Sequence, residues 1–207
     1  MKYETINPHL EEIHPWGEYI PKYADKLILG TFPTKEENRA FKFFYPNKNN
    51  RFWKILSELA DFKLSDGAKF NSELAVIERK KILDILRLGI SDIGLKVLRQ
   101  KNSSSDDNLF PLEFKDVFHI LDEHPNIKTI IITSSSGANS VFSWFSTYCR
   151  INGLELPTLK NFKASENSIQ IEFRNRIVNI VIACSTSRAT SKTEDYLLTL
   201  YRDILCR

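Results

Sequence analysis

Short apolar runs alternate along the chain with stretches in which apolar residues recur every three or four positions. The apolar runs within 26–31, 89–94 and 128–135 predict buried strands that end in polar loops. A further stretch, "SIQIEF-RN-RIVNIVIACS", contains an alternating strand, an Asn-containing turn and a more apolar strand. This pattern predicts a hairpin whose second strand lies in the interior of a sheet.

Helical periodicity separates these strands. Apolar residues at i, i+3, i+4 and i+7, from Phe52 to Leu59, predict a helix over about 51–60. Other helices are predicted at about 74–87, 113–123 and 139–149, and an amphipathic helix closes the chain after the capping-box sequence "SKTE" at 191–194. Strands that alternate with helices predict an α/β fold, a three-layer α/β/α sandwich with a mostly parallel central sheet. No repeat or long linker divides the sequence, so we expect one domain over 1–207.

Three segments show neither the strand pattern nor the helical pattern of apolar residues. The lead-in with "HPWGEYIPKY" is rich in Pro and aromatic residues and is expected to cover the core irregularly. The segment 35–50, dense in charge and aromatics, is expected to be a loop or a short helix. The polar, breaker-rich sequence "RQKNSSSDDN" at 99–108 predicts a flexible, solvated surface loop.

Composition narrows the classes of function only slightly. The chain has 207 residues, 42% of them hydrophobic, and a formal net charge of +3, which permits nucleic acid as a partner without requiring it. The three cysteines and four histidines lack metal-ligand or disulfide spacing. The polar N-terminal sequence lacks the apolar core of a signal peptide, and no apolar run is long enough to span a bilayer. We therefore expect a cytoplasmic protein with no membrane partner.

Three strand ends carry candidate chemistry: Gly30–Pro33, Thr133–Gly137 and Cys184–Arg188. In an open parallel sheet, ligands bind beyond the carboxyl ends of the strands, so these ends are expected to share one rim. Gly30 lets a ligand or another backbone come close, because it has no Cβ. A plain strand-to-loop exit explains the same residues.

Hydroxyl and basic residues gather before the predicted last helix. Hydroxyls and free amides at a helix N-terminus bind phosphate, and neighbouring cations would strengthen such a site. Helix capping by Ser and Thr is the alternative, although it accounts for only one or two hydroxyls. The predicted phosphate-binding residues are Ser185, Thr186, Ser187, Arg188, Ser191 and Lys192.

The residues before the first predicted helix allow two interpretations each. Asn50 is either a helix N-cap or a rim amide that holds a water or contacts a base. Phe44 and Tyr45 are either lids on the core or a stacking platform for a planar ring. Phe52 and Trp53 are expected in the core, and Asp92 is either a site residue or a turn former, with a supporting role favoured.

Four stretches taken together resemble the uracil-DNA glycosylase superfamily, most of all its hypoxanthine-DNA (deoxyinosine) branch, with the mismatch-specific uracil glycosylases as cousins. They are "LILGTFPT", "FFYPNKNNRFWKIL", "GISDIGLKVLRQKNSSSDDNL" and "IACSTSRATS". The resemblance implies a DNA repair enzyme of base excision, a monofunctional glycosylase that hydrolyses the N-glycosidic bond of a flipped-out deaminated base such as hypoxanthine or uracil. It implies no metal or organic cofactor, and a monomer that binds damaged DNA.

The resemblance also implies roles for particular residues. Asn50 falls on the Asn of the Asn-x-Phe-Trp motif and would position the water or contact the base. The base pocket would be lined by Gly30, Thr31, Phe32 and Pro33, with Tyr45 stacking on the base. Thr31 and Phe32 stand where many superfamily members carry a water-activating Asp or Asn, a loss shared with the deoxyinosine branch. A catalytically inactive nucleic-acid-binding member is the alternative, and a small-molecule hydrolase is a third hypothesis.

Overall fold

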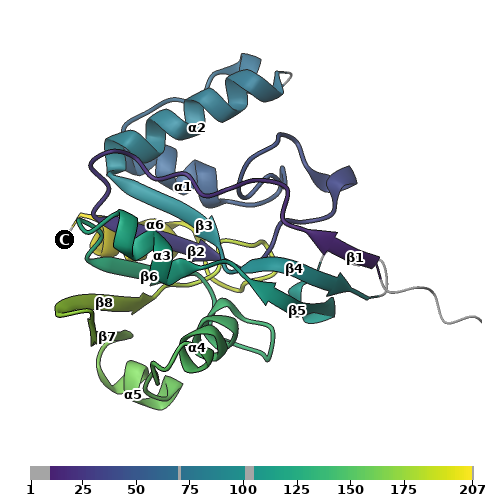
Figure 1. The fold of residues 1–207 in the computed structure, drawn as a ribbon. Coiled ribbons are helices and arrows are strands. Elements are labelled where there is room, and N and C mark those ends of the chain that lie inside the picture. Colours follow the sequence, from purple (N-terminus) through teal and green to yellow (C-terminus); the bar gives the residue numbers. More distant parts are fainter. Residues whose placement is uncertain (1–9, 70, 101–104, 207) are drawn as a thin grey trace, which may run out of the picture.

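The computed structural model describes residues 10–69, 71–100 and 105–206. Its larger sheet has five strands in the order β3-β2-β6-β8-β7 (Figure 1). Four strands are parallel to their neighbours, and the edge strand β7 pairs antiparallel with β8, so the sheet is mixed. The strands are β2 (Lys26–Gly30), β3 (Leu88–Asp92), β6 (Thr129–Ile132), β7 (Ser168–Phe173) and β8 (Arg176–Ile182).

The predicted hairpin is confirmed as β7 and β8. Its two turn residues, Arg174 and Asn175, have φ values of 46° and 65°. Two consecutive residues with positive φ match a two-residue turn of type I′, whose twist suits a right-handed hairpin. β8 lies between β6 and β7, in the interior of the sheet as expected.

Helices cover both faces of this sheet. The side chain of Ile28 joins an apolar cluster with α1 (Phe52–Leu59), α2 (Ser72–Leu86) and α6 (Glu194–Leu205). Its neighbours Leu27 and Leu29 join a second cluster with α3 (Val117–Glu123), α4 (Val141–Ile151) and α5 (Leu159–Ala164). This alternation follows from the two-residue period of a strand, and it makes the molecule an α/β protein with a core on each side of the sheet.

A second sheet was not expected from the sequence. It has three antiparallel strands in the order β1-β4-β5: β1 (Leu10–Ile13), β4 (Gly94–Arg99) and β5 (Leu109–Phe114). β4 begins two residues after β3 ends, so this sheet continues from the carboxyl edge of the larger one (Figure 1). Pro111 is tolerated because β5 is an edge strand.

This sheet corrects three predictions. Residues 10–13 of the lead-in form a strand, the predicted helix at 113–123 begins only at Val117, and Arg99 of the predicted loop belongs to β4. The rest of that loop ends in a short 3-10 helix, η3 (Asp106–Asn108), while residues 1–9 and 101–104 lie outside the described residues. Two more 3-10 turns are η1 (Glu36–Asn38), inside the segment predicted as loop or short helix, and η2 (Asp66–Lys69).

The strand registers bring the predicted strand ends into line. Gly30 pairs with Asp92, Leu29 pairs with Ile132, and Ile132 pairs with Ile182. The residues that follow, Thr133 and Ala183, therefore leave the sheet at the same edge as Gly30. Among the described helices, none combines the length and the apolar character needed to cross a bilayer.

Candidate functional site at the carboxyl edge of the sheet

A buried carboxylate occupies the space above Gly30. A Cβ added to Gly30 would lie 2.1 Å from Asp92 Oδ1, so this position requires glycine. The other carboxylate oxygen, Asp92 Oδ2, is 2.9 Å from His14 Nε2, and His14 Nδ1 is 2.6 Å from the Trp16 carbonyl oxygen. The His14 side chain is fully buried. Asp92 is therefore held against the first strand end by a partner from the lead-in.

Tyr45 joins two strand ends through its hydroxyl. The Tyr45 hydroxyl donates to Thr133 Oγ1 at 3.1 Å, and Thr133 Oγ1 donates to the Leu29 carbonyl at 2.8 Å. One ring face stacks on Phe52 with centroids 3.9 Å apart. Burial raises the pKa of Tyr45 well above its ordinary value, so the phenol stays neutral and can donate. Its neighbour Phe44 lies in the core, as do Phe52 and Trp53, the latter two as expected.

The side chain of Asn50 has a determined orientation. Its Oδ1 accepts from the backbone N–H of Phe52 at 2.9 Å and from the Thr186 hydroxyl at 2.7 Å. A backbone N–H donates only to an acceptor, so the atom facing Phe52 is the amide oxygen and not the nitrogen. The amide NH₂ group is consequently the part of the side chain that remains for a ligand. Asn50 thus links the start of α1 to the segment after β8.

Arg51 attaches that segment to α1. Its guanidinium donates to the backbone carbonyls of Ser187 at 2.9 Å and Lys192 at 2.7 Å, and more weakly to that of Thr186 at 3.4 Å. The backbone N–H of Arg51 also donates to the Thr186 carbonyl. Carbonyl oxygens carry only partial charges, so these hydrogen bonds do not neutralise the positive charge of the guanidinium beside the segment 185–192.

The predicted phosphate-binding residues all lie in this segment, but not at a helix start. α6 begins at Glu194 with Thr193 as its N-cap, which corrects the prediction that "SKTE" caps the helix through Ser191. Thr186 is buried against Asn50, and the Ser185 and Ser187 hydroxyls accept from the backbone N–H groups of Ser187 and Ala189. The residues exposed to solvent are Arg188, Ser191 and Lys192.

The loop after β2 is buried, and residues of the lead-in and of the small sheet contact it. Thr31, Phe32 and Pro33 are all buried, and the Phe32 ring meets the His14 ring edge-to-face at 5.5 Å. The Pro33 carbonyl accepts from Arg99 Nη2 at 3.0 Å. Arg99 is itself buried and forms an ion pair with Glu12 at 2.6 Å. The small sheet therefore positions the loop that the sequence predicted as the base pocket.

A second carboxylate reaches the same loop. Asp106 Oδ2, in η3, accepts from Thr31 Oγ1 at 2.9 Å. Asp106 remains exposed to solvent, yet desolvation by the surrounding protein raises its pKa to about 6. Its hydrogen bond to Thr31 and the charge of Arg99 oppose the rise, whereas the charges of Asp92 and Asp107 add to it. A carboxyl group with a pKa near neutrality is chemically useful, because it can exchange a proton at physiological pH.

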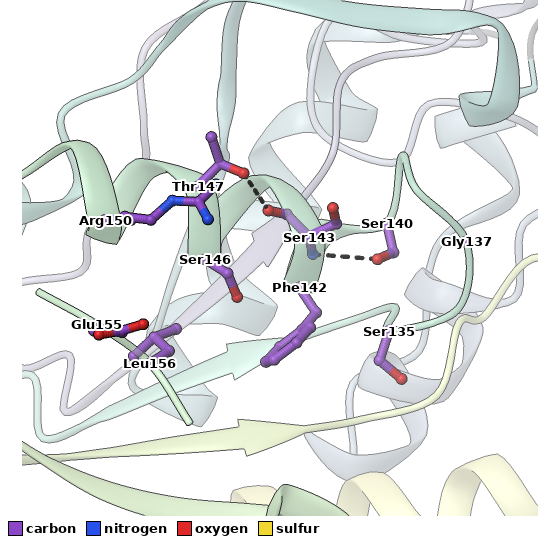
Figure 2. Close-up of a pocket in the computed structure, with 10 residues that line it drawn as sticks. All are labelled: Ser135, Gly137, Ser140, Phe142, Ser143, Ser146, Thr147, Arg150, Glu155 and Leu156. Atoms are coloured by element: carbon purple, nitrogen blue, oxygen red, sulfur yellow. Dashed lines mark hydrogen bonds between the residues drawn. The ribbon is translucent and has the colours of Figure 1, made fainter. Parts of the chain in front are cut away.

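A separate cavity of about 320 Å³ runs from the loop after β6 along α4 (Figure 2). It starts at Ser135 and Gly137 and continues past Ser143 and Ser146 to Arg150. It is rich in hydroxyl groups, and the Thr147 hydroxyl donates to the Ser143 carbonyl. Asn50, Tyr45 and Asp106 do not line this cavity, so it is distinct from the cluster at the strand ends.

Sequence reasoning did not find four residues that organise the site: His14, Arg51, Arg99 and Asp106. All four act on residues at least 66 positions away, which no local pattern reveals. Arg51 could have been noticed, because a cation is unfavourable at a helix N-terminus and needs another reason to be there.

Comparison with known proteins supports the fold. No family model matches the sequence, and no curated protein matches it either. Among solved structures, the chain is similar to the solution NMR structure of a "putative Uracil DNA glycosylase" from Methanosarcina acetivorans. The TM-score is 0.56 with 19% sequence identity, over 91% of this chain and 96% of that chain. At this identity the likeness shows that the two proteins share a fold.

Proposed function

We propose that the protein is a monofunctional DNA glycosylase of base excision repair, a single domain with the three-layer α/β/α arrangement of the uracil-DNA glycosylase superfamily. Its substrate is a deaminated base, hypoxanthine or uracil, flipped out of DNA, as in the hypoxanthine-DNA glycosylase branch. Removing a base from the stack costs a few kcal/mol, and least for a mispaired or damaged base. The pocket must then stabilise the leaving base while water replaces it.

The observation that carries the proposal is the orientation of Asn50. Its oxygen is engaged by Phe52 N–H and by the Thr186 hydroxyl, so its NH₂ group is the part that meets a ligand. Hypoxanthine and uracil each bear a carbonyl oxygen on which negative charge develops as the glycosidic bond breaks. An N–H donor aimed at such an oxygen lowers the barrier, because it is already oriented before the charge appears. This favours contact with the base over positioning of the water for Asn50.

The other predicted residues have complementary tasks. Tyr45, whose ring stacks on Phe52, uses its other ring face to stack on the base, and the loop Gly30–Pro33 forms the wall beside it. Arg188 and Lys192 are exposed and lie in the segment that also carries the charge of Arg51, which suits phosphates on either side of the flipped nucleotide.

An oligonucleotide assay tests the proposal. Fluorescent single-stranded and double-stranded DNA with one hypoxanthine or uracil is incubated with the protein and then treated with alkali. We expect cleavage only after alkali, because a monofunctional enzyme leaves the abasic strand intact. Absence of excision from both bases contradicts the proposal, and binding without excision supports an inactive nucleic-acid-binding protein instead.

Asn50→Asp gives the sharper test of mechanism. Aspartate retains an oxygen for Phe52 N–H and Thr186, but it replaces the NH₂ donor with a second acceptor. We expect excision to fall by about 10²–10³-fold, the loss typical of a missing oxyanion donor, with folding retained. Asn49→Asp, the same change at the exposed neighbouring position, is the matched control and should keep full activity.

A further inference from the structure

We propose that Asp106 is the general base that activates the attacking water. The inference rests on the proposed glycosylase function. It assigns the water-activating role to a residue of η3, outside the first loop. The orientation of Asn50 makes such a group necessary, because an NH₂ donor cannot accept a proton from water.

The contacts of Asp106 suit this role. Its Oδ2 accepts from Thr31 Oγ1 at 2.9 Å, which orients the carboxylate against the loop predicted to wall the base pocket. On the other side, the Asp107 carbonyl accepts from Asn139 Nδ2 at 3.2 Å, so η3 also contacts the loop that precedes α4. Asp106 is an exposed residue, so its carboxylate lies between this loop and the surface of the molecule.

The neighbouring acidic and basic groups are less suited. Asp92 is buried, with one oxygen against the Gly30 backbone and the other bonded to His14. His14 is fully buried and cannot meet a substrate. Arg99 is committed to Glu12 and to the Pro33 carbonyl. Of these groups, only Asp106 combines contact with the loop and access to solvent.

The electrostatic surroundings adjust the basicity of Asp106. Desolvation together with the charges of Asp92 and Asp107 favours the neutral acid, while the Thr31 hydroxyl and Arg99 favour the anion, and the pKa lies at about 6. The neutral phenol of Tyr45 also faces this group of carboxylates. At neutral pH most Asp106 is ionised yet more basic than an ordinary aspartate, which is the condition for general-base catalysis.

The step balances without a cofactor. The water oxygen bonds to C1′ of the sugar as the C1′–N bond breaks, and the electron pair of that bond leaves with the base. Asp106 takes the proton of the attacking water and later releases it to solvent. The departing base, whose carbonyl oxygen accepts from the Asn50 NH₂ group, gains a proton from solvent. The products are the free base and DNA with a hydroxyl at C1′.

The test compares pH–rate profiles under single-turnover conditions. For the unmodified protein we expect the excision rate to fall as the pH drops below about 6, because one group, the Asp106 carboxylate, takes up a proton. Asp106→Asn should lower the rate at pH 7 by about 10²–10⁴-fold and remove this acid limb. Asp107→Asn, the same change at the exposed adjacent residue, removes a charge that favours the neutral acid, so it should keep the acid limb, moved slightly to lower pH, and a rate at pH 7 close to that of the unmodified protein.

Thr31→Val provides a second variant that does not depend on the folding of Asp106→Asn. Loss of the hydroxyl removes a hydrogen bond that favours the anion, so the acid limb should move to higher pH. An acid limb that stays in place in Thr31→Val overturns the inference, as does an Asp106→Asn rate within threefold of the unmodified protein. In both cases excision by the unmodified protein leaves the glycosylase function standing. If the unmodified protein excises neither base, the function itself fails and this role fails with it.

Discussion

Replacement of Gly30 by alanine tests the packing at the centre of the site. The added Cβ would lie 2.1 Å from Asp92 Oδ1, whereas ordinary contacts begin at 3.4 Å. The carboxylate cannot retreat that far and keep its 2.9 Å hydrogen bond to His14. Overpacking a core costs about 1–3 kcal/mol, and leaving a buried polar group without its hydrogen bond costs about 1–3 kcal/mol.

We therefore expect Gly30→Ala to lower the free energy of unfolding by about 3 kcal/mol, at the upper end of these two ranges. For a chain of this size, such a loss lowers the melting temperature by about 6–12 °C. Chemical denaturation followed by circular dichroism measures the free energy, and a thermal scan measures the shift. Gly17→Ala is the matched control, because nothing lies within 4 Å of a Cβ there, and it should change stability by less than about 0.5 kcal/mol.

A double-mutant cycle identifies the cause. Asp92→Ala removes the atoms that a Cβ on Gly30 would meet first, so Gly30→Ala should cost less than about 1 kcal/mol on that background. The contact that remains is the Tyr45 hydroxyl at 3.1 Å. If the two substitutions prove additive, or if Gly30→Ala alone behaves like Gly17→Ala, the steric reasoning is wrong.

Three further predictions concern the same edge. Arg51→Lys cannot donate to three carbonyls, so limited proteolysis mapped by mass spectrometry should show faster cutting within 185–192; an unchanged cleavage pattern contradicts this role. Arg188→Ala combined with Lys192→Ala should make the slope of log K against log salt for duplex DNA less negative by about 2 units. Lys160→Ala with Lys163→Ala on α5, across the sheet, is the control and should keep the slope. Tyr45→Phe keeps the stack on Phe52 but loses the hydroxyl, so it should cost about 0.5–1.5 kcal/mol of stability with excision largely retained. Tyr45→Ala should lose excision, and equal activity of the two variants refutes stacking on the base.

The larger sheet and most of its helices could be predicted because their signal is local. In α1 burial of one face imposes a helical period on the sequence, and in β2 burial of both faces gives a short continuous apolar run; both signals can be read without knowing the partner. The small sheet gave no such signal, since three of the four residues of β1 are exposed and its pairing joins residues 10–13 to residues 96–99. α5 was missed because it is six residues long and buries only Phe162.

The candidate site was predictable in outline and not in its connections. Gly30, Tyr45 and Asn50 could be selected from their residue types beside a strand end or a helix start. The contacts that orient them come from His14 and Asp92, 78 positions apart, and from Thr186, 136 positions from Asn50. Such pairs depend on how the chain folds back on itself, and a single sequence carries no local trace of them.

Two arginines, one buried and one half-buried, stabilise this irregular edge of the sheet. Loops expose backbone carbonyls that lack sheet partners, and each of these costs free energy when it is buried without a hydrogen bond. Arg99 supplies a donor to the Pro33 carbonyl, and Arg51 supplies donors to the segment after β8. The two residues differ in charge balance, because Arg99 is paired with Glu12 whereas the bonds of Arg51 go to carbonyls. The charge of Arg99 is therefore offset beneath the proposed base pocket, whereas that of Arg51 adds positive charge beside the segment proposed to meet phosphates, where it suits binding of a DNA backbone.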